Sequence, residues 1–305
     1  DFNIDPLAAP AGGGLIAKTF MLLNTFDVAN MDERRWAALV SQALAISIES
    51  MSDNYYEKDL DVLLDQTWAS KERKRISMPR SSSSVRSLDI SFSKKFDTNW
   101  VGEPGAHTSH FVTADCSGLA VSLTQTIGPV FGAKAATPNL GFAYAATMGG
   151  YLRTGPQIPG ERPRTAIAPV FVTKNNKIVL ALGAAGGIRI PSAIVQTISR
   201  FIDQGKTLFE AIAAPRIHPK QSIDENNHRG IDLLAFEAET SAPGWSQADV
   251  NYWRTQGFNV TEVDKHASFG RVHAITKQNN VLKGTADPDW EGSASDQIIC
   301  RGVAN

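Results

Sequence analysis

The hydrophobic pattern of this chain changes its period at Thr108, and that change limits the folds that the chain can adopt. Before this residue, apolar side chains recur every three or four positions. This spacing predicts a helix over 15–26, a second helix that begins after a cap at Asp32, and a short third helix over 60–68. Residues 79–107 contain a serine run and no sustained period, so we interpret them as a loop or Ser-rich linker.

From Thr108 onwards the dominant period is two, which is the period of a strand. Strands are predicted over 108–115, 119–126, 166–173, 178–182, 231–237, 259–263, 271–276 and 281–285. The helical period returns over 192–204, 207–213 and 247–256. The hairpin over 166–182 is almost continuously apolar, which is typical of strands that are buried on both faces. Helices before and after such strands predict layers, with sheets between helices.

Composition excludes several classes of function. A formal net charge of −1 over 305 residues attracts neither nucleic acid nor an anionic membrane surface. No apolar run approaches the roughly 18 residues that a membrane span needs. Six histidines lie without ligand spacing, and Cys116 and Cys300 are too few for a disulfide framework and lack the surroundings of a metal site. We therefore expect no metal and no other cofactor.

Thr108 is a candidate nucleophile because of its position in the sequence, at the start of a predicted strand. A threonine hydroxyl needs a base beside it, and a threonine at a freed N-terminus can use its own α-amino group. That group titrates near ~7.7–8.0, so a useful fraction is already the free base at neutral pH. Thr108 opens a strand directly after a segment that could move away once it is cut. Ordinary β-propensity would also explain a threonine at this position.

Short motifs along nearly the whole chain narrow the interpretation. Thr-Ser-His-Phe opens the strand at Thr108, and Gly-Leu-Ala-Val-Ser-Leu-Thr-Gln-Thr follows at 118–126. Further motifs lie at 10–14, 23–27, 131–132, 162–169, 183–190, 214–218 and 284–288. Together they resemble the γ-glutamyltransferase (γ-glutamyltranspeptidase) family. By this resemblance, residues 1–107 are the C-terminal part of the large-subunit region and residues 108–305 the small-subunit catalytic region. The two together would form one αββα domain.

The resemblance implies a fold and a set of catalytic residues. The fold would be α+β, the four-layer αββα sandwich of the N-terminal-nucleophile hydrolases. Thr108 would cut the chain after His107 and then act as the nucleophile. Thr126 would support it through its hydroxyl, and the backbone N–H groups of Gly186 and Gly187 would form the oxyanion hole. Considered alone, the two glycines would be only a turn that ends a strand.

The substrate-recognition positions depart from the family pattern. The family asparagine is Gly128 here, and the acidic end of the segment around Thr147, which grips an α-ammonium, has become glycine. Thr165 keeps one of two hydroxyls that bind the α-carboxylate. The carboxylate-pairing arginine belongs to an upstream part of the large subunit that this chain does not contain. Because a buried ammonium without a carboxylate is costly, a free γ-glutamyl head group should bind poorly.

Two functions are compatible with these residues. The first is a hydrolase or acyltransferase that acts on a γ-glutamyl or related amide bond with altered substrate recognition. Its substrate would be a small molecule or peptide, and its partner the missing upstream large-subunit segment. The second is a degenerate, non-catalytic relative with a binding or structural role. Family resemblance places either protein outside the cytoplasm: extracellular, periplasmic or at the cell surface.

Overall fold

The computed structural model describes residues 2–51, 64–79, 108–146, 159–160, 162, 165–223, 229–266, 268–289, 292–295 and 298–300. Its helices are α1 (Gly13–Leu23), α2 (Glu33–Ser50), α4 (Gln66–Glu72), α6 (Ile190–Ile202), α7 (Leu208–Ala213) and α8 (Gln247–Thr255), with 3-10 turns η2 (Arg73–Arg75) and η3 (Gly187–Arg189). Its strands are β1 (Asn3–Pro6), β2 (Thr108–Ala114), β3 (Ala120–Thr126), β4 (Val170–Lys174), β5 (Lys177–Ala185), β6 (Ile217–Ile223), β7 (Arg229–Glu239), β8 (Asn259–Val263), β9 (Arg271–Gln278), β10 (Val281–Ala286) and β11 (Ile298–Ile299).

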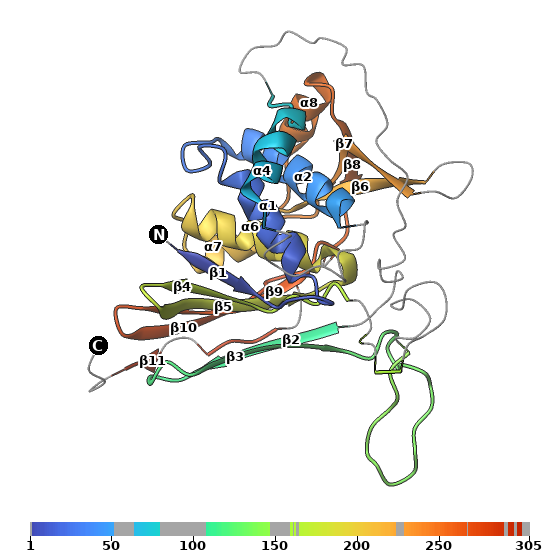
Figure 1. The fold of residues 1–305 in the computed structure, drawn as a ribbon, viewed down its shortest axis with the longest axis vertical. Helices are drawn as coiled ribbons and strands as arrows, with labels where there is room; N and C mark the ends of the chain where they lie inside the picture. Colours follow the sequence, from blue (N-terminus) through green and yellow to red (C-terminus); the bar gives the residue numbers. More distant parts are fainter. Residues whose placement is uncertain are drawn as a thin grey trace.

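These elements form layers around one antiparallel six-stranded sheet, in the order β1-β4-β5-β9-β10-β11. Helices α1, α6 and α7 cover one face of this sheet, and the hairpin β2–β3 lies against the other face (Figure 1). Helix α2 packs on α1, and the small sheet β6–β7–β8 packs on α2. This combination of helical and sheet layers confirms the predicted α+β class.

Local signals in the sequence set several element boundaries. The Asp32 carboxylate accepts a hydrogen bond from the backbone N–H of Arg35 and caps α2, as predicted. The turn between β2 and β3 is held by Asp115, whose carboxylate accepts from the N–H groups of Gly118 and Leu119. This short turn sets the register of the hairpin, in which Ala114 lies opposite Ala120.

The main core lies between the helices and the six-stranded sheet. It joins the apolar faces of α1, α2 and α6 to the helix-facing side chains of β4, β5 and β9. Trp36 is fully buried there, and its indole N–H donates to the Ser199 hydroxyl at 3.1 Å. Because β5 is covered by helices on one face and by the hairpin on the other, its apolar run needs no alternation.

The structure corrects parts of the sequence interpretation. Of the predicted helix over 60–68, the structure describes residues 64–68, and helix α4 begins among them at Gln66 after the Asp65 cap. Residues 52–63 lie outside the described part. Strands β1, β6 and β11 were not predicted. Strands β1 and β11 are short and β6 contains Pro219, and β1 forms only by pairing with the distant strand β4. Of the predicted linker over 79–107, only Pro79 is described, and residues 80–107 lie outside the described part.

A disulfide between Cys116 and Cys300 fastens the hairpin to the rest of the molecule. The two Cα atoms are 5.3 Å apart, and 184 positions separate the cysteines in the sequence. Cys116 lies in the β2–β3 turn, whereas Cys300 directly follows β11 at the edge of the six-stranded sheet. Two cysteines are too few for a framework, yet they form one long-range link.

Among the described residues, no helix has both the length and the apolar character to cross a membrane.

Candidate active site

Thr108 and Thr126 face each other across the hairpin. Thr108 is the first residue of β2 and Thr126 the last of β3, and the antiparallel register pairs them directly. The Thr126 hydroxyl accepts a hydrogen bond from the N–H of Gly128 at 3.1 Å, which orients its side chain. The structure therefore brings together the predicted nucleophile and the predicted supporting threonine, because the hairpin turn sets their register.

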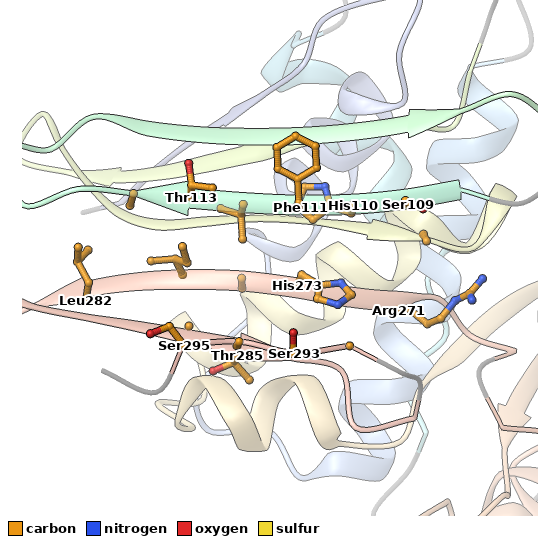
Figure 2. A pocket seen from close by; sticks show the side chains of 18 of the residues that line it. Ser109, His110, Phe111, Thr113, Arg271, His273, Leu282, Thr285, Ser293 and Ser295 are labelled. Carbon is orange, nitrogen blue, oxygen red and sulfur yellow. The ribbon is translucent and has the colours of Figure 1, made fainter. Parts of the chain in front are cut away.

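A cavity of about 560 Å³ runs along β2 and has Thr108 at one end. All seven residues of β2 line one wall, and β9, β10 and residues 292–295 line the other (Figure 2). Ser109 and Arg271 lie at the Thr108 end, whereas Thr113 and Leu282 lie at the far end (Figure 2). We call this cavity the β2 cleft. Its far end is predominantly apolar, with Val112, Ala114, Ile275, Leu282 and Ile298.

The turn formed by Gly186 and Gly187 ends β5 close to this cleft. Ala185, the last residue of β5, lines the cleft together with Thr108. Gly186 has φ 144° and Gly187 has φ 59°, backbone conformations that favour glycine. A Cβ atom on Gly186 would also lie 2.7 Å from the Cα atom of Gly270. The chain can therefore turn sharply from β5 into η3 and α6 only with glycine here.

His110 is held by close packing on the inner face of β2. Its Nδ1 atom lies 2.8 Å from the Thr124 hydroxyl oxygen. Its ring fills the space over Gly183, where an added Cβ atom would lie 2.4 Å from the ring Cε1 atom. Burial first, and the neighbouring His273 second, lower the pKa of His110 to about 4. The His110 imidazole in the cleft wall is therefore neutral at neutral pH.

The opposite wall of the cleft contains His273, whose pKa is also lowered, mainly by burial and against the attraction of Asp287. On β9, Arg271, His273, Ala274 and Ile275 line the cleft. Val272 and Ala274, on the alternate positions, are also buried in the core. No role was predicted for His110, His273 or Arg271 from the sequence. The alternating pattern of β2 and of β9 indicates which face of its own strand each side chain occupies. It does not indicate that the two strands lie next to each other.

Of the remaining predicted recognition residues, the structure describes Thr165 and Gly128, and neither lines the cleft. Thr165 is absent from its lining, and the Thr165 hydroxyl instead accepts a hydrogen bond from the N–H of Ile167 at 3.1 Å. Gly128 has φ 84°, and a Cβ atom there would lie 3.2 Å from the Ala146 carbonyl oxygen. A side chain at position 128 would thus be both strained and crowded. Thr147 and His107 lie outside the described residues.

Known proteins resemble this chain in sequence. The family model described as Gamma-glutamyltranspeptidase matches residues 2–296. A glutathione hydrolase proenzyme of Pseudomonas sp. (strain A14) is 27% identical over 81% of this chain and 45% of its own length. An acylase ACY 1 proenzyme of Pseudomonas sp. (strain V22) is 28% identical over 73% of this chain and 40% of its own length. The chain thus spans less than half the length of these two relatives.

Solved structures share the fold. Cephalosporin acylase from Bacillus halodurans superposes with a TM-score of 0.72 at 20% identity, over 96% of this chain and 52% of that chain. The gamma-glutamyltranspeptidase of Pseudomonas nitroreducens, complexed with L-DON, superposes with a TM-score of 0.50 at 24% identity, over 61% of this chain and 97% of that chain. These likenesses confirm the N-terminal-nucleophile hydrolase fold. With the family model matching almost its full length, this chain belongs to the gamma-glutamyltranspeptidase family.

Proposed function

We propose that this chain is the catalytic part of an amide hydrolase or acyltransferase whose nucleophile is the Thr108 hydroxyl. The observation that carries the proposal is the position of Thr108, opposite Thr126 and at the polar end of the β2 cleft. A substrate that lies in this cleft would have its scissile amide near Thr108. Family membership supports amide-bond chemistry, since named relatives are glutathione hydrolases and acylases.

The proposed reaction begins with self-cleavage of the bond between His107 and Thr108. The Thr108 hydroxyl oxygen attacks the His107 carbonyl carbon, and the peptide nitrogen leaves as the free α-amino group. This step replaces an amide with an ester. Water then hydrolyses the ester, which leaves a carboxylate on His107 and a free amino-terminal threonine. The predicted division into regions 1–107 and 108–305 is the division made by this cut.

The same hydroxyl then acts on the substrate. The Thr108 α-amino group takes the hydroxyl proton as the oxygen attacks the substrate carbonyl carbon, and the N–H groups of Gly186 and Gly187 stabilise the resulting oxyanion. When the carbon–nitrogen bond breaks, the proton passes to the leaving amine. Water or an acceptor amine then attacks the acyl ester and gives a proton to the α-amino group. Release of the acyl product restores the Thr108 hydroxyl.

We propose that the substrate differs from a free γ-glutamyl amide in its head group. At position 128, the backbone conformation and the nearby Ala146 carbonyl disfavour a recognition side chain. The Thr165 hydroxyl is occupied by a local hydrogen bond to the backbone. The apolar far end of the β2 cleft favours an acyl group or amine portion with an apolar body. A related amide without an α-ammonium group would match this chemistry best.

The proposed partner is an upstream large-subunit segment. The outer face of the hairpin exposes apolar side chains: Phe111 (45%), Leu119 (68%), Val121 (42%) and Leu123 (38%). The arm over 127–146 adds exposed Val130, Phe131, Leu140, Phe142 and Tyr144. Apolar surface of this extent marks an interface. Packing of the upstream segment here would cover the hairpin and complete the second sheet.

The proposed location is outside the cytoplasm: extracellular, periplasmic or at the cell surface. The disulfide between Cys116 and Cys300 supports it, because such bonds persist in oxidising compartments. The alternative function, a non-catalytic relative with a binding or structural role, is favoured only by the altered recognition residues such as Gly128.

Turnover distinguishes the two functions. We would incubate the full-length protein with γ-glutamyl-p-nitroanilide and with glutaryl-p-nitroanilide, which lacks the α-ammonium, and follow release of p-nitroaniline. The proposal predicts turnover of the glutaryl amide and little of the γ-glutamyl amide, with Thr108→Ala inactive on both. Activity that persists in Thr108→Ala would reject Thr108 as the nucleophile. A wild-type protein without turnover of either amide would favour the non-catalytic relative.

A further inference from the structure

The buried ion pair between Arg216 and Asp287 makes hydrogen bonds to the backbone on both sides of Arg271, the first residue of β9. The Arg216 Nη2 atom lies 2.7 Å from the Asp287 Oδ2 atom, and both side chains are almost fully buried. Arg216 donates through Nη1 to the Gly270 carbonyl oxygen at 2.9 Å. Asp287 accepts from the Val272 N–H, also at 2.9 Å. The pair therefore holds the backbone on both sides of Arg271, a residue of the cleft wall.

The backbone that the pair holds lies directly behind the glycine turn. Gly270 has φ 94°, and its Cα atom occupies the space where Gly186 would carry a Cβ atom, 2.7 Å away. On its other side, a Cβ atom on Gly270 would lie 2.9 Å from the Ala193 Cβ atom in α6. Gly270 is thus wedged between the turn and the first part of the helix that follows the turn. Displacement of Gly270 would leave Gly186 without its support.

Burial of two charges is expensive, and hydrophobic residues in their place often give equal stability. Stability alone therefore explains this pair poorly. Its hydrogen bonds are directed at backbone groups that position the turn, and the backbone of Arg216 is itself held. The Arg216 N–H donates to a Glu239 carboxylate oxygen at 2.9 Å, and its carbonyl accepts from the Trp245 indole N–H at 3.1 Å.

We propose that Arg216 and Asp287 are positioning residues that fix the Gly186–Gly187 turn through Gly270. The inference rests on the proposed function, in which the N–H groups of this turn stabilise the oxyanion. Oxyanion donors act only when they are correctly placed, and a misplacement of about 1 Å can cost on the order of 100-fold in rate. The pair touches neither substrate nor nucleophile in this scheme, so its effect falls on the transition state and not on substrate binding.

Arg216→Lys is the informative variant. Lysine keeps the charge that Asp287 requires, but a single ammonium group cannot reproduce the separate bonds to Asp287 and the Gly270 carbonyl. Arg200→Lys is the matched control: Arg200 is fully buried, pairs with Glu33 at 3.3 Å and donates to the Pro215 carbonyl oxygen at 2.8 Å, but it contacts neither Asp287 nor the Gly270 carbonyl through a hydrogen bond. Arg200 lies near the C-terminal end of α6, whereas the turn precedes its N-terminal end. Both variants would be assayed as full-length protein, well below their melting temperatures.

The expected result is a fall of kcat and of kcat/KM by the same factor in Arg216→Lys, about 10- to 100-fold, with KM unchanged. Asp287→Asn, which keeps an acceptor for Val272, should lose less activity than Asp287→Ala. Arg200→Lys should retain the wild-type kcat. Wild-type kcat in Arg216→Lys, or an equal loss in Arg200→Lys, would overturn the inference.

Amide hydrogen exchange gives a readout that needs no turnover. The N–H groups of residues 186–187 should exchange faster in Arg216→Lys than in wild type. In Arg200→Lys, their exchange rates should equal those of wild type. If the wild-type protein turned over no amide, the proposed function would fail. The exchange result would still decide whether the ion pair holds the turn, and equal exchange in all three proteins would refute it.

Discussion

Removal of the disulfide between Cys116 and Cys300 should lower the stability of this protein substantially. A cross-link stabilises mainly by restricting the unfolded chain, and the restriction grows with the length of the closed loop. The cysteines are 184 positions apart, for which the chain-entropy relation gives about 5 kcal/mol at 25 °C. Native disulfides in small domains typically contribute about 2–5 kcal/mol, so this value is an upper bound.

The loss can be expressed as a melting temperature. With an unfolding entropy of about 2.1 cal/mol/K per residue, a chain of 305 residues loses about 3–8 °C for a destabilisation of about 2–5 kcal/mol. The proposed cut before Thr108 lies outside the loop between the two cysteines, so it does not change the loop length. The prediction therefore holds for the cut and the uncut protein.

Calorimetry of the double variant Cys116→Ser/Cys300→Ser measures this shift without leaving a free thiol. A reductant should bring the wild-type protein to the melting temperature of the variant and leave the variant unchanged. If wild type and variant melted within about 1 °C of each other, or if alkylation of native protein found two free thiols, the reasoning would be refuted.

Two further predictions concern the packing and the protonation of His110. Gly183→Ala should destabilise by about 1–3 kcal/mol, because its new Cβ atom meets the imidazole ring, and His110→Ala should relieve the loss in a double-mutant cycle measured by chemical denaturation. The lowered pKa of His110 means that the unfolded state binds a proton more readily. Stability should therefore be lost as pH falls from about 6.5 to about 4, by up to about 3 kcal/mol, and His110→Gln should flatten this slope; equal slopes in both proteins would contradict the assignment.

Glu239 acts in the opposite direction over an overlapping pH range. Burial is the main cause that raises its pKa to about 7. A raised carboxyl pKa contributes stability at low pH that is lost as pH rises from about 4.5 to about 7. The difference in stability between His110→Gln and wild type at each pH does not contain the Glu239 contribution, because Glu239 is present in both proteins.

Much of the fold was predictable wherever local chemistry decides it. The Asp32 cap, the periodicity of α6 and the hairpin turn at Asp115 all depend on residues that are close in sequence. Once that turn is placed, Thr108 must lie opposite Thr126. The position of Thr126 opposite Thr108 therefore follows from the hairpin, whereas the catalytic roles predicted for both residues came from the family resemblance.

The rest depends on contacts between distant segments. Strand β1 forms because Asn3–Pro6 pairs with β4, more than 160 residues away in the sequence. The bond between Cys116 and Cys300, and the meeting of His110 with His273, likewise require the tertiary fold. No short-range pattern indicates which two strands will form the walls of the cleft.

The central claim, that Thr108 becomes a free amino-terminal nucleophile, is tested most directly by intact mass spectrometry of the full-length protein. Purified protein would be measured before and after prolonged incubation, beside Thr108→Ala. The proposal predicts two fragments whose masses sum to the chain plus one water, with Thr108 at the new N-terminus and no cleavage in the variant. A single unchanged mass for the wild-type protein would contradict the account and favour a non-catalytic relative.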